Sequence, residues 1–210
     1  MTADLLTLVT IGLIHWLAVM SPGPSFLITA RTAVAQSPAD GIKVALGLGI
    51  GSAVWAAAAL LGLNLLFQQF HWLFIATKIA GALYLIWIAY QIFRHAADPV
   101  KIDEAANDKV ASGPLLRGFL TQLANPKVVV FFGSIFVAML PKEIPGWMVV
   151  ALIVMVTANE IVWYSLVSMF FGSSPVRRFY FTAKRWIDRT TGVFLGLLGA
   201  RLLWRAGDAA

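Results

Sequence analysis

Two charged side chains, Lys127 and Glu160, each lie well inside a long apolar stretch of this sequence. A lysine in the middle of a bilayer costs roughly 2.5–3.5 kcal/mol on insertion scales, so it should face a cavity or a partner. One interpretation is that the two residues form a structural salt bridge with each other. The other is that the pair forms the gate of a transport site, with Asn159 and Gln122 as nearby polar groups.

Two proline motifs, Ser21-Pro22-Gly23-Pro24 and Asn125-Pro126-Lys127, interrupt two of the apolar stretches. Proline removes a backbone donor and crowds the preceding turn, so a helix is predicted to break at each motif. Ser21 and Asn125 are the expected N-caps of the new half-helices, and Pro22 and Pro126 the expected first-turn residues. Because a helix N-terminus attracts anions, both breaks are candidate sites for an anionic group. A kink that only shapes packing is the alternative for the first motif.

Other chemistry is less well supported by the residue types. A serine hydrolase would use Ser21 as nucleophile with His15 or Lys127 as base, but a capping role already accounts for Ser21. His15 alone on an apolar helix is more typical of a packed residue than of a ligand. Gly47 and Gly51 sit in an apolar stretch with no preceding strand, so they predict close helix packing rather than a nucleotide loop. With no cysteine, three histidines and no carboxylate cluster in the apolar stretches, we expect no metal site and no organic cofactor.

The composition requires a membrane setting for these residues. Of 210 residues, 60% are hydrophobic and 12% charged, whereas soluble domains average about 45–50% and about 25%. The net charge of +6 fits basic cytoplasmic loops better than nucleic-acid binding, for which there is no basic groove with interleaved aromatics. We therefore expect membrane lipid as a partner and no nucleic acid.

The apolar stretches predict an all-α membrane protein with six transmembrane helices, since each is near the ~20 residues that span a bilayer. No ten-residue alternation of the kind found in membrane β-barrels occurs. The predicted spans are Leu5–Ala30, Val44–Phe67, Trp72–Phe93, Leu115–Leu140, Trp147–Phe171 and Ile187–Trp204.

The charged segments between these spans predict the orientation. Residues 94–114 form a polar cytoplasmic linker, and residues 176–187 alternate apolar and basic residues as a short helix in the membrane interface would. A basic loop is the alternative for the second segment. Eleven Lys and Arg residues fall on one side of the six spans and four on the other, so the positive-inside rule places both termini outside the cytoplasm.

The two halves of the chain show a weak internal similarity. Ser21-Pro22 falls opposite Asn125-Pro126, and Val54-Trp55 opposite Val162-Trp163, when the chain is cut in the linker. Residues 1–93 and 115–210 would then be two three-helix repeats, each with a broken first helix. Repeats with an odd number of spans insert in opposite orientations, the inverted-repeat plan of secondary transporters, whose substrate binds near the bilayer midplane at broken helices.

Several motifs resemble one known family. They are Met20-Ser21-Pro22-Gly23-Pro24, Gly81-Ala82-Leu83-Tyr84-Leu85 with Tyr90-Gln91, Leu123-Ala124-Asn125-Pro126-Lys127, Phe132-Gly133-Ser134 and Lys184-Arg185-Trp186-Ile187-Asp188. Over nearly the whole chain the sequence resembles the LysE/RhtB amino-acid exporters of bacteria, and within them the threonine-efflux branch. It differs from many threonine exporters in having Ser25, where those often have Asp.

The resemblance implies a multi-pass protein of the bacterial inner membrane that exports a small neutral amino acid, threonine or homoserine-like, in exchange for protons. Exporters of leucine or of basic amino acids share the same motifs, and a membrane enzyme or scaffold is the alternative from another class. A homodimer is an open possibility. The resulting candidate substrate-binding residues are Ser21, Pro22, Gly23, Pro24, Ser25, Gln122, Asn125, Pro126, Lys127, Asn159 and Glu160. Glu160, the only carboxylate well inside a predicted span, would take the proton and the substrate ammonium in turn.

Overall fold

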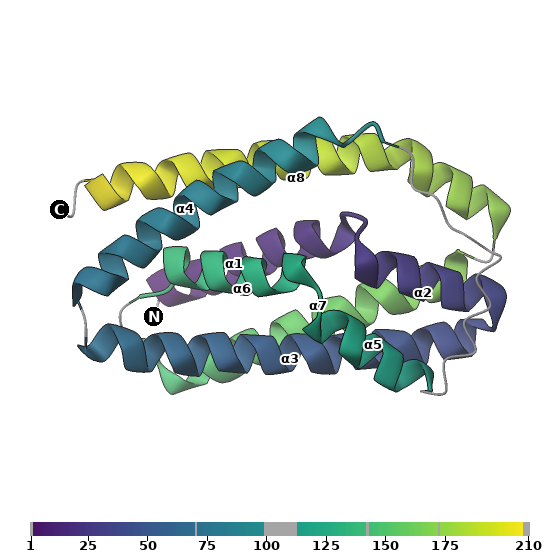
Figure 1. Ribbon diagram of the computed structural model, residues 1–210, viewed down its shortest axis with the longest axis horizontal. Coiled ribbons are helices and arrows are strands. Elements are labelled where there is room, and N and C mark those ends of the chain that lie inside the picture. Colours follow the sequence, from purple (N-terminus) through teal and green to yellow (C-terminus); the bar gives the residue numbers. More distant parts are fainter. Residues whose placement is uncertain (1, 70, 99–112, 142, 172, 208–210) are drawn as a thin grey trace.

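The computed structural model describes residues 2–69, 71–98, 113–141, 143–171 and 173–207, and within these ranges the regular structure is entirely helical (Figure 1). This confirms the predicted all-α class. Most of the predicted polar linker, residues 99–112, lies outside the described residues. The helices are α1 Thr2–Met20, α2 Pro24–Ala35, α3 Pro38–Gln69, α4 His71–Arg94, α5 Pro114–Leu123, α6 Pro126–Met139, α7 Gly146–Phe170 and α8 Ser174–Gly207.

Both proline motifs break a helix, as predicted. α1 ends at Met20 and α2 begins at Pro24, with a bend of 54° between them. α5 ends at Leu123 and α6 begins at Pro126, which occupies the first helical turn. The local cause is the same in each case, because a proline without an N–H fits only the start of a helix.

The predicted caps are half right. The Asn125 side chain accepts a hydrogen bond from the Lys127 backbone N–H at 3.0 Å, so Asn125 is the N-cap of α6. The N-cap of α2 is Gly23 in an extended conformation, without a side-chain bond; the prediction of Ser21 with Pro22 in the first turn was wrong. Two prolines compete at this break, and the helix begins at the second one, Pro24.

Long helices complete each half of the chain. By length and composition, two described helices are able to cross a membrane, residues Pro38–Gly62 of α3 and Gly146–Phe170, and the bent α1–α2 pair is a third if it counts as one span. In α4 the described apolar part, Ala82–Arg94, is shorter. The six-span arrangement therefore stays a prediction.

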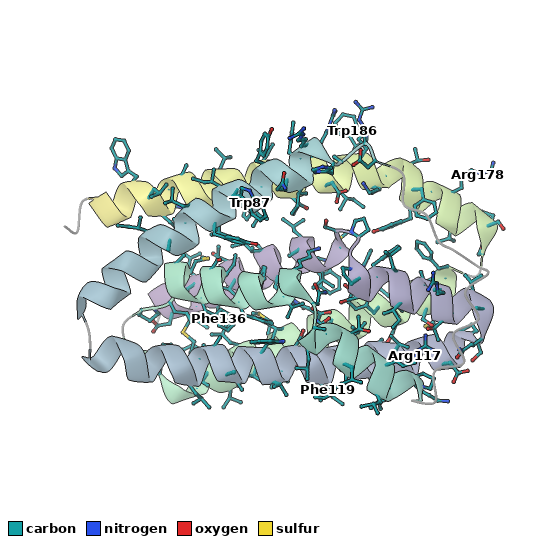
Figure 2. All side chains as sticks on the ribbon, in the orientation of Figure 1. Trp87, Arg117, Phe119, Phe136, Arg178 and Trp186 are labelled. Carbon is teal, nitrogen blue, oxygen red and sulfur yellow. The ribbon has the colours of Figure 1, made fainter. Side chains whose placement is uncertain are left out.

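The separate interfacial helix predicted at residues 176–187 is replaced by one continuous helix, α8, of 34 residues. Neither glycine nor proline occurs between Pro175 and Gly192, so nothing in the sequence stops the helix there. Phe179 and Trp186 are exposed on its outer side, whereas Tyr180 is buried against the protein. Figure 2 shows Arg178 and Trp186 projecting away from the other helices.

The packing brings α3 between α5 and α7, and α4 alongside α8. α3 runs parallel to α5 and antiparallel to α7, while α4 is antiparallel to α8 (Figure 1). Close approach depends on glycine: a Cβ at Gly47 would meet the Leu115 carbonyl, and one at Gly51 would lie 2.7 Å from Cβ of Gln122. The predicted close packing at these glycines is confirmed, and it sets Gln122 against α3.

Candidate functional site

The two helix breaks lie against each other, although about a hundred residues separate them in the sequence. The Lys127 ammonium at the start of α6 donates hydrogen bonds to the carbonyls of Ala18 at 2.7 Å and Ser21 at 2.8 Å. These carbonyls end α1, where unpaired acceptors carry the negative end of the helix dipole. Lys127 therefore compensates the end of α1 from another part of the chain.

A buried hydrogen-bond network continues from this junction. Asn125 Nδ2 donates to Ser25 Oγ at 2.9 Å, and Ser25 Oγ donates to Gln122 Oε1 at 2.6 Å. Gln122 Nε2 then donates to Ser52 Oγ at 2.6 Å and to Glu160 Oε1 at 2.9 Å. Through Gln122, the network joins α2, α3, α5 and α7, so the positions of the two breaks and of Glu160 are linked.

Glu160 has two unlike carboxylate oxygens. Oε1 accepts from Gln122 and lies 3.7 Å from His15 Nε2. Oε2 is buried and has no hydrogen-bond partner among the described residues. A buried carboxylate oxygen without a donor is costly, so this atom is the one place on Glu160 where a proton or an ammonium group would be stabilised.

Lys127 and Glu160 do not form the salt bridge considered as an alternative. Among the ion pairs that join described residues, none links these two side chains, yet both line the same cavity. An ammonium has three N–H donors, and Lys127 uses two of them on Ala18 and Ser21. One donor is left for another acceptor.

The cavity between Lys127 and Glu160 is narrow and has one polar wall and one apolar wall. It leaves about 30 Å³ for the centres of water molecules, which is room for a water molecule or two and not for an amino acid. Ser25, Asn125, Lys127, Glu160 and His15 supply its polar wall. The apolar wall and the rest of the lining come from Ala18, Val19, Val128, Phe131, Phe132 and Tyr164.

The predicted site residues fall into three groups. Four line the cavity: Ser25, Asn125, Lys127 and Glu160. Gln122 and Asn159 contact Glu160 or its neighbour His15 from behind, and the Ser21 carbonyl binds Lys127. Pro22, Gly23 and Pro24 shape the first break and are not among the described lining of the cavity, although a Cβ at Gly23 would lie 3.7 Å from Lys127 Cδ; Pro126 begins α6 at the second break.

Three residues of this site were missed by the sequence reasoning: His15, Ser52 and Tyr164. His15 lies in the cavity wall beside Glu160 rather than in ordinary packing. Tyr164 follows Glu160 by four residues, so helical spacing alone could have placed it on the same face. Ser52 had no signal, because only the packing of α3 on α5 brings it to Gln122.

The arrangement differs from that of a serine hydrolase in the part of the chain that the structure describes. Hydrogen bonds join the Ser21 backbone, not its hydroxyl, to Lys127, and Ser21 does not line the cavity. No group of three or more potential metal ligands occurs among the described residues.

Comparison with known proteins places the chain among transporters. The family model described as LysE type translocator matches residues 16–206. The threonine efflux protein of Escherichia coli is 34% identical over 95% of this chain and 98% of its own length, and that of Salmonella typhi 35% identical over 92% and 96%. A leucine efflux protein from an Enterobacter species is 28% identical over 86% and 85%. No solved structure matches the chain.

Proposed function

Since the chain belongs to the LysE type translocator family, we propose that it is a secondary active transporter that exports a small neutral amino acid, such as threonine, in exchange for protons. It would act as a multi-pass protein of the bacterial inner membrane, with both termini on the outer side. Threonine is favoured over leucine because the threonine efflux proteins are more similar to this chain.

The observation that carries this proposal is the pair of unused groups across one cavity. Glu160 Oε2 has no donor among the described residues, and Lys127 has one N–H beyond its two bonds to α1. A zwitterionic amino acid presents one ammonium and one carboxylate, which match these two groups in sign. Asn125 and the N-terminus of α6 lie next to Lys127 and would favour the carboxylate at that end.

The charge balance of the cavity supports a neutral substrate. Its described lining contains one lysine and one glutamate. A lysine or arginine substrate would need a further carboxylate for its side chain, because a buried unpaired charge is strongly disfavoured. The apolar wall at Val128 and Phe131 suits a short, uncharged side chain.

We base proton exchange on competition between a proton and the substrate ammonium for one atom, Glu160 Oε2. When Glu160 Oε2 is protonated, it cannot accept an ammonium as an anion; when it is ionised, it can. Exposure to the more acidic outside would load the proton, and exposure to the cytoplasm would release it and admit the substrate. Export of one amino acid is thereby coupled to entry of one proton.

We also propose that the two halves are inverted repeats. Each half consists of a broken helix followed by two long helices. α3 is parallel to α5 and antiparallel to α7, and α1 is parallel to α7, as the contacts of Trp16 with Trp163 and of Gly12 with Met155 indicate. Corresponding helices of the two halves thus run in opposite directions, which supports alternating access around the two breaks.

Because the cavity is smaller than an amino acid, substrate entry requires the breaks to move apart. Such a movement would break hydrogen bonds of the network that Gln122 holds together. An opening on one side would separate Ser25 from Asn125 and Gln122.

The test is transport by the purified protein in lipid vesicles. Vesicles loaded with single labelled amino acids, including threonine, homoserine, leucine, lysine and arginine, should release threonine or homoserine fastest when the outside is made acidic. Empty vesicles and vesicles with Glu160→Gln protein are the controls. Preferential release of lysine or arginine would overturn the substrate proposal, and release that ignores the pH gradient would overturn proton exchange.

A further inference from the structure

A polar chain on the α1–α7 interface ends at Glu160. Asn159 Nδ2 lies 3.4 Å from the Gly12 carbonyl and 3.3 Å from His15 Nδ1, and His15 Nε2 lies 3.7 Å from Glu160 Oε1. His15 is 2% exposed and Glu160 4%. The three side chains therefore lie in one line, with His15 between the amide and the carboxylate.

The amide determines which histidine nitrogen carries the proton. The nitrogen of an asparagine amide has two N–H donors and no acceptor. One donor points to the Gly12 carbonyl and the other to His15 Nδ1, so Nδ1 must be the accepting nitrogen of the ring. A neutral imidazole then carries its proton on Nε2, directed toward Glu160.

We propose that Asn159 fixes His15 in the Nε2–H form, so that His15 is a positioning residue for Glu160 and not a second proton carrier. This inference rests on the proposed proton exchange at Glu160. Gln122 donates to Oε1 at 2.9 Å and the Nε2–H of His15 faces the same oxygen at 3.7 Å, which leaves Oε2 as the atom that exchanges a proton for the substrate ammonium.

The surroundings of His15 oppose both a second proton and a ring flip. A proton on Nδ1 would point at the Asn159 amide hydrogens. Phe131 meets the ring edge-on at 5.0 Å and Phe132 stacks on it at 5.8 Å between centroids, which holds its orientation. Turning the ring over would therefore require both phenyl groups to move.

Of the titratable groups around His15, Lys127 opposes a second proton on the ring and ionised Glu160, 3.7 Å away, favours one. From the helices packed on α1, Lys127 of α6 and Tyr164 of α7 line the cavity with His15, and Asp188 of α8 is within electrostatic range of Lys127. The Lys127 ammonium adds a positive charge near His15, so a second positive charge on the ring is disfavoured. Glu160 is the group in this set that is placed to gain and lose the coupling proton.

The direct test is ¹⁵N NMR of the histidine ring in protein labelled at histidine. The chain has three histidines, so a His71→Gln/His95→Gln background leaves His15 as the only signal. We expect one protonated and one unprotonated ring nitrogen, unchanged between about pH 8 and about pH 5, across the range where a free histidine titrates. A doubly protonated His15 that forms at the pH midpoint of transport would overturn the proposal.

The matched variant is Asn159→Asp, which keeps the shape and replaces the donor by an acceptor. It should place a proton on His15 Nδ1 and give the pH profile of export a second titration, whereas Asn159→Leu should remove the tautomer preference without adding one. An Asn159→Asp protein with the wild-type ring spectrum and pH profile would also overturn the proposal.

Substitution of His15 itself separates positioning from proton transfer. His15→Leu should lose about tenfold in transport, and His15→Gln, which retains an N–H that can reach Glu160, should recover part of that loss without moving the midpoint of the pH profile. Loss of the pH response in His15→Gln would show that His15 carries the proton. If Glu160→Gln transports with normal pH dependence, the proposed exchange fails, but the ring spectrum still reports on the Asn159 contact.

Discussion

Two lysines of the second half, Lys127 and Lys184, reach across the molecule in the same way. Lys127 donates to the carbonyls of Ala18 and Ser21 at the end of α1, and Lys184 donates to those of His95 and Ala96 just beyond the end of α4, at 3.2 and 3.1 Å. Each ammonium therefore neutralises the negative end of a helix from the first half.

The two lysines differ in where the opposite charge lies. Lys184 is paired with Asp188 at 2.9 Å, four residues further along the same helix, and both side chains are almost completely buried. Among the described residues Lys127 has no carboxylate at ion-pair distance, and Glu160 lines the same cavity. A charge that is cancelled by its own helix holds the fold together, whereas two charges kept apart can be joined by a ligand.

The largest expected effect is on stability at the paired lysine. Lys184→Met leaves Asp188 buried without its partner, which should lower the free energy of unfolding by about 3–5 kcal/mol while transport per folded protein stays near wild type. Thermal unfolding in detergent and uptake normalised to folded protein would measure the two effects. Lys184→Met/Asp188→Leu removes both charges and should recover much of the stability; no recovery would show that the carbonyl contacts, not the ion pair, dominate.

The next largest effect is on transport at the unpaired lysine. Lys127→Met removes the proposed carboxylate donor, and the loss of a charge-assisted hydrogen bond of about 1.5–3 kcal/mol corresponds to a roughly 10- to 150-fold decrease in transport. Lys127→Arg should recover only part of it, because a planar fork does not reproduce a compact ammonium. Efflux of labelled threonine, measured at matched expression, compares both variants with wild type. Normal export by Lys127→Met would show that Lys127, like Lys184, has only a structural role.

Glu160→Gln tests the opposite charge of the site. With the membrane potential held at zero, one-for-one exchange driven by a gradient of about one pH unit should give a roughly tenfold accumulation of amino acid on the acidic side. The amide cannot lose a proton, so the variant should give no accumulation even if substrate still binds. Asp188→Asn is the matched control, since that carboxylate is structural; an unchanged gradient response in Glu160→Gln would assign Glu160 to packing.

The smallest effect concerns the glycine beside Lys127. A Cβ at Gly23 would lie 3.7 Å from Lys127 Cδ and 4.0 Å from Nζ, which are ordinary contact distances. Gly23→Ala should therefore transport within about twofold of wild type. Gly23→Leu should displace the Lys127 side chain and reduce transport about fivefold to tenfold, which is less than the full loss of one charge-assisted hydrogen bond would give. Equal rates for Gly23→Leu and wild type would show that the position of Lys127 does not limit transport.

The pairing at Lys184 is visible in the sequence, while the contacts made by Lys127 are not. Lys184 and Asp188 are four residues apart, a spacing that makes neighbours on any helix. Lys127 contacts Ser21 from 106 residues away, and Asn125 contacts Ser25 from 100. No local rule predicts such contacts.

Other features also separate into those that local sequence patterns predict and those that depend on tertiary packing. Proline chemistry alone predicted both helix breaks and the Asn125 cap, because a missing N–H acts within one turn. It did not predict that α2 begins at Pro24, since two prolines offer two possible starts and the choice depends on what surrounds the break. Nor did the basic residues at 176–187 reveal that α8 runs on without interruption.

The sequence by itself determined the apolar helices, the broken segments and the residue types that we propose hold both charges of an amino acid. The tertiary structure decided that Lys127 and Glu160 stay unpaired, that Gln122 binds the network together, and that His15 belongs to the site. The physical reason is the distance along the chain over which each effect acts. Proline, capping and hydrophobic effects act on neighbouring residues. The distance between two charges depends on how α1, α6 and α7 pack, which no single segment encodes.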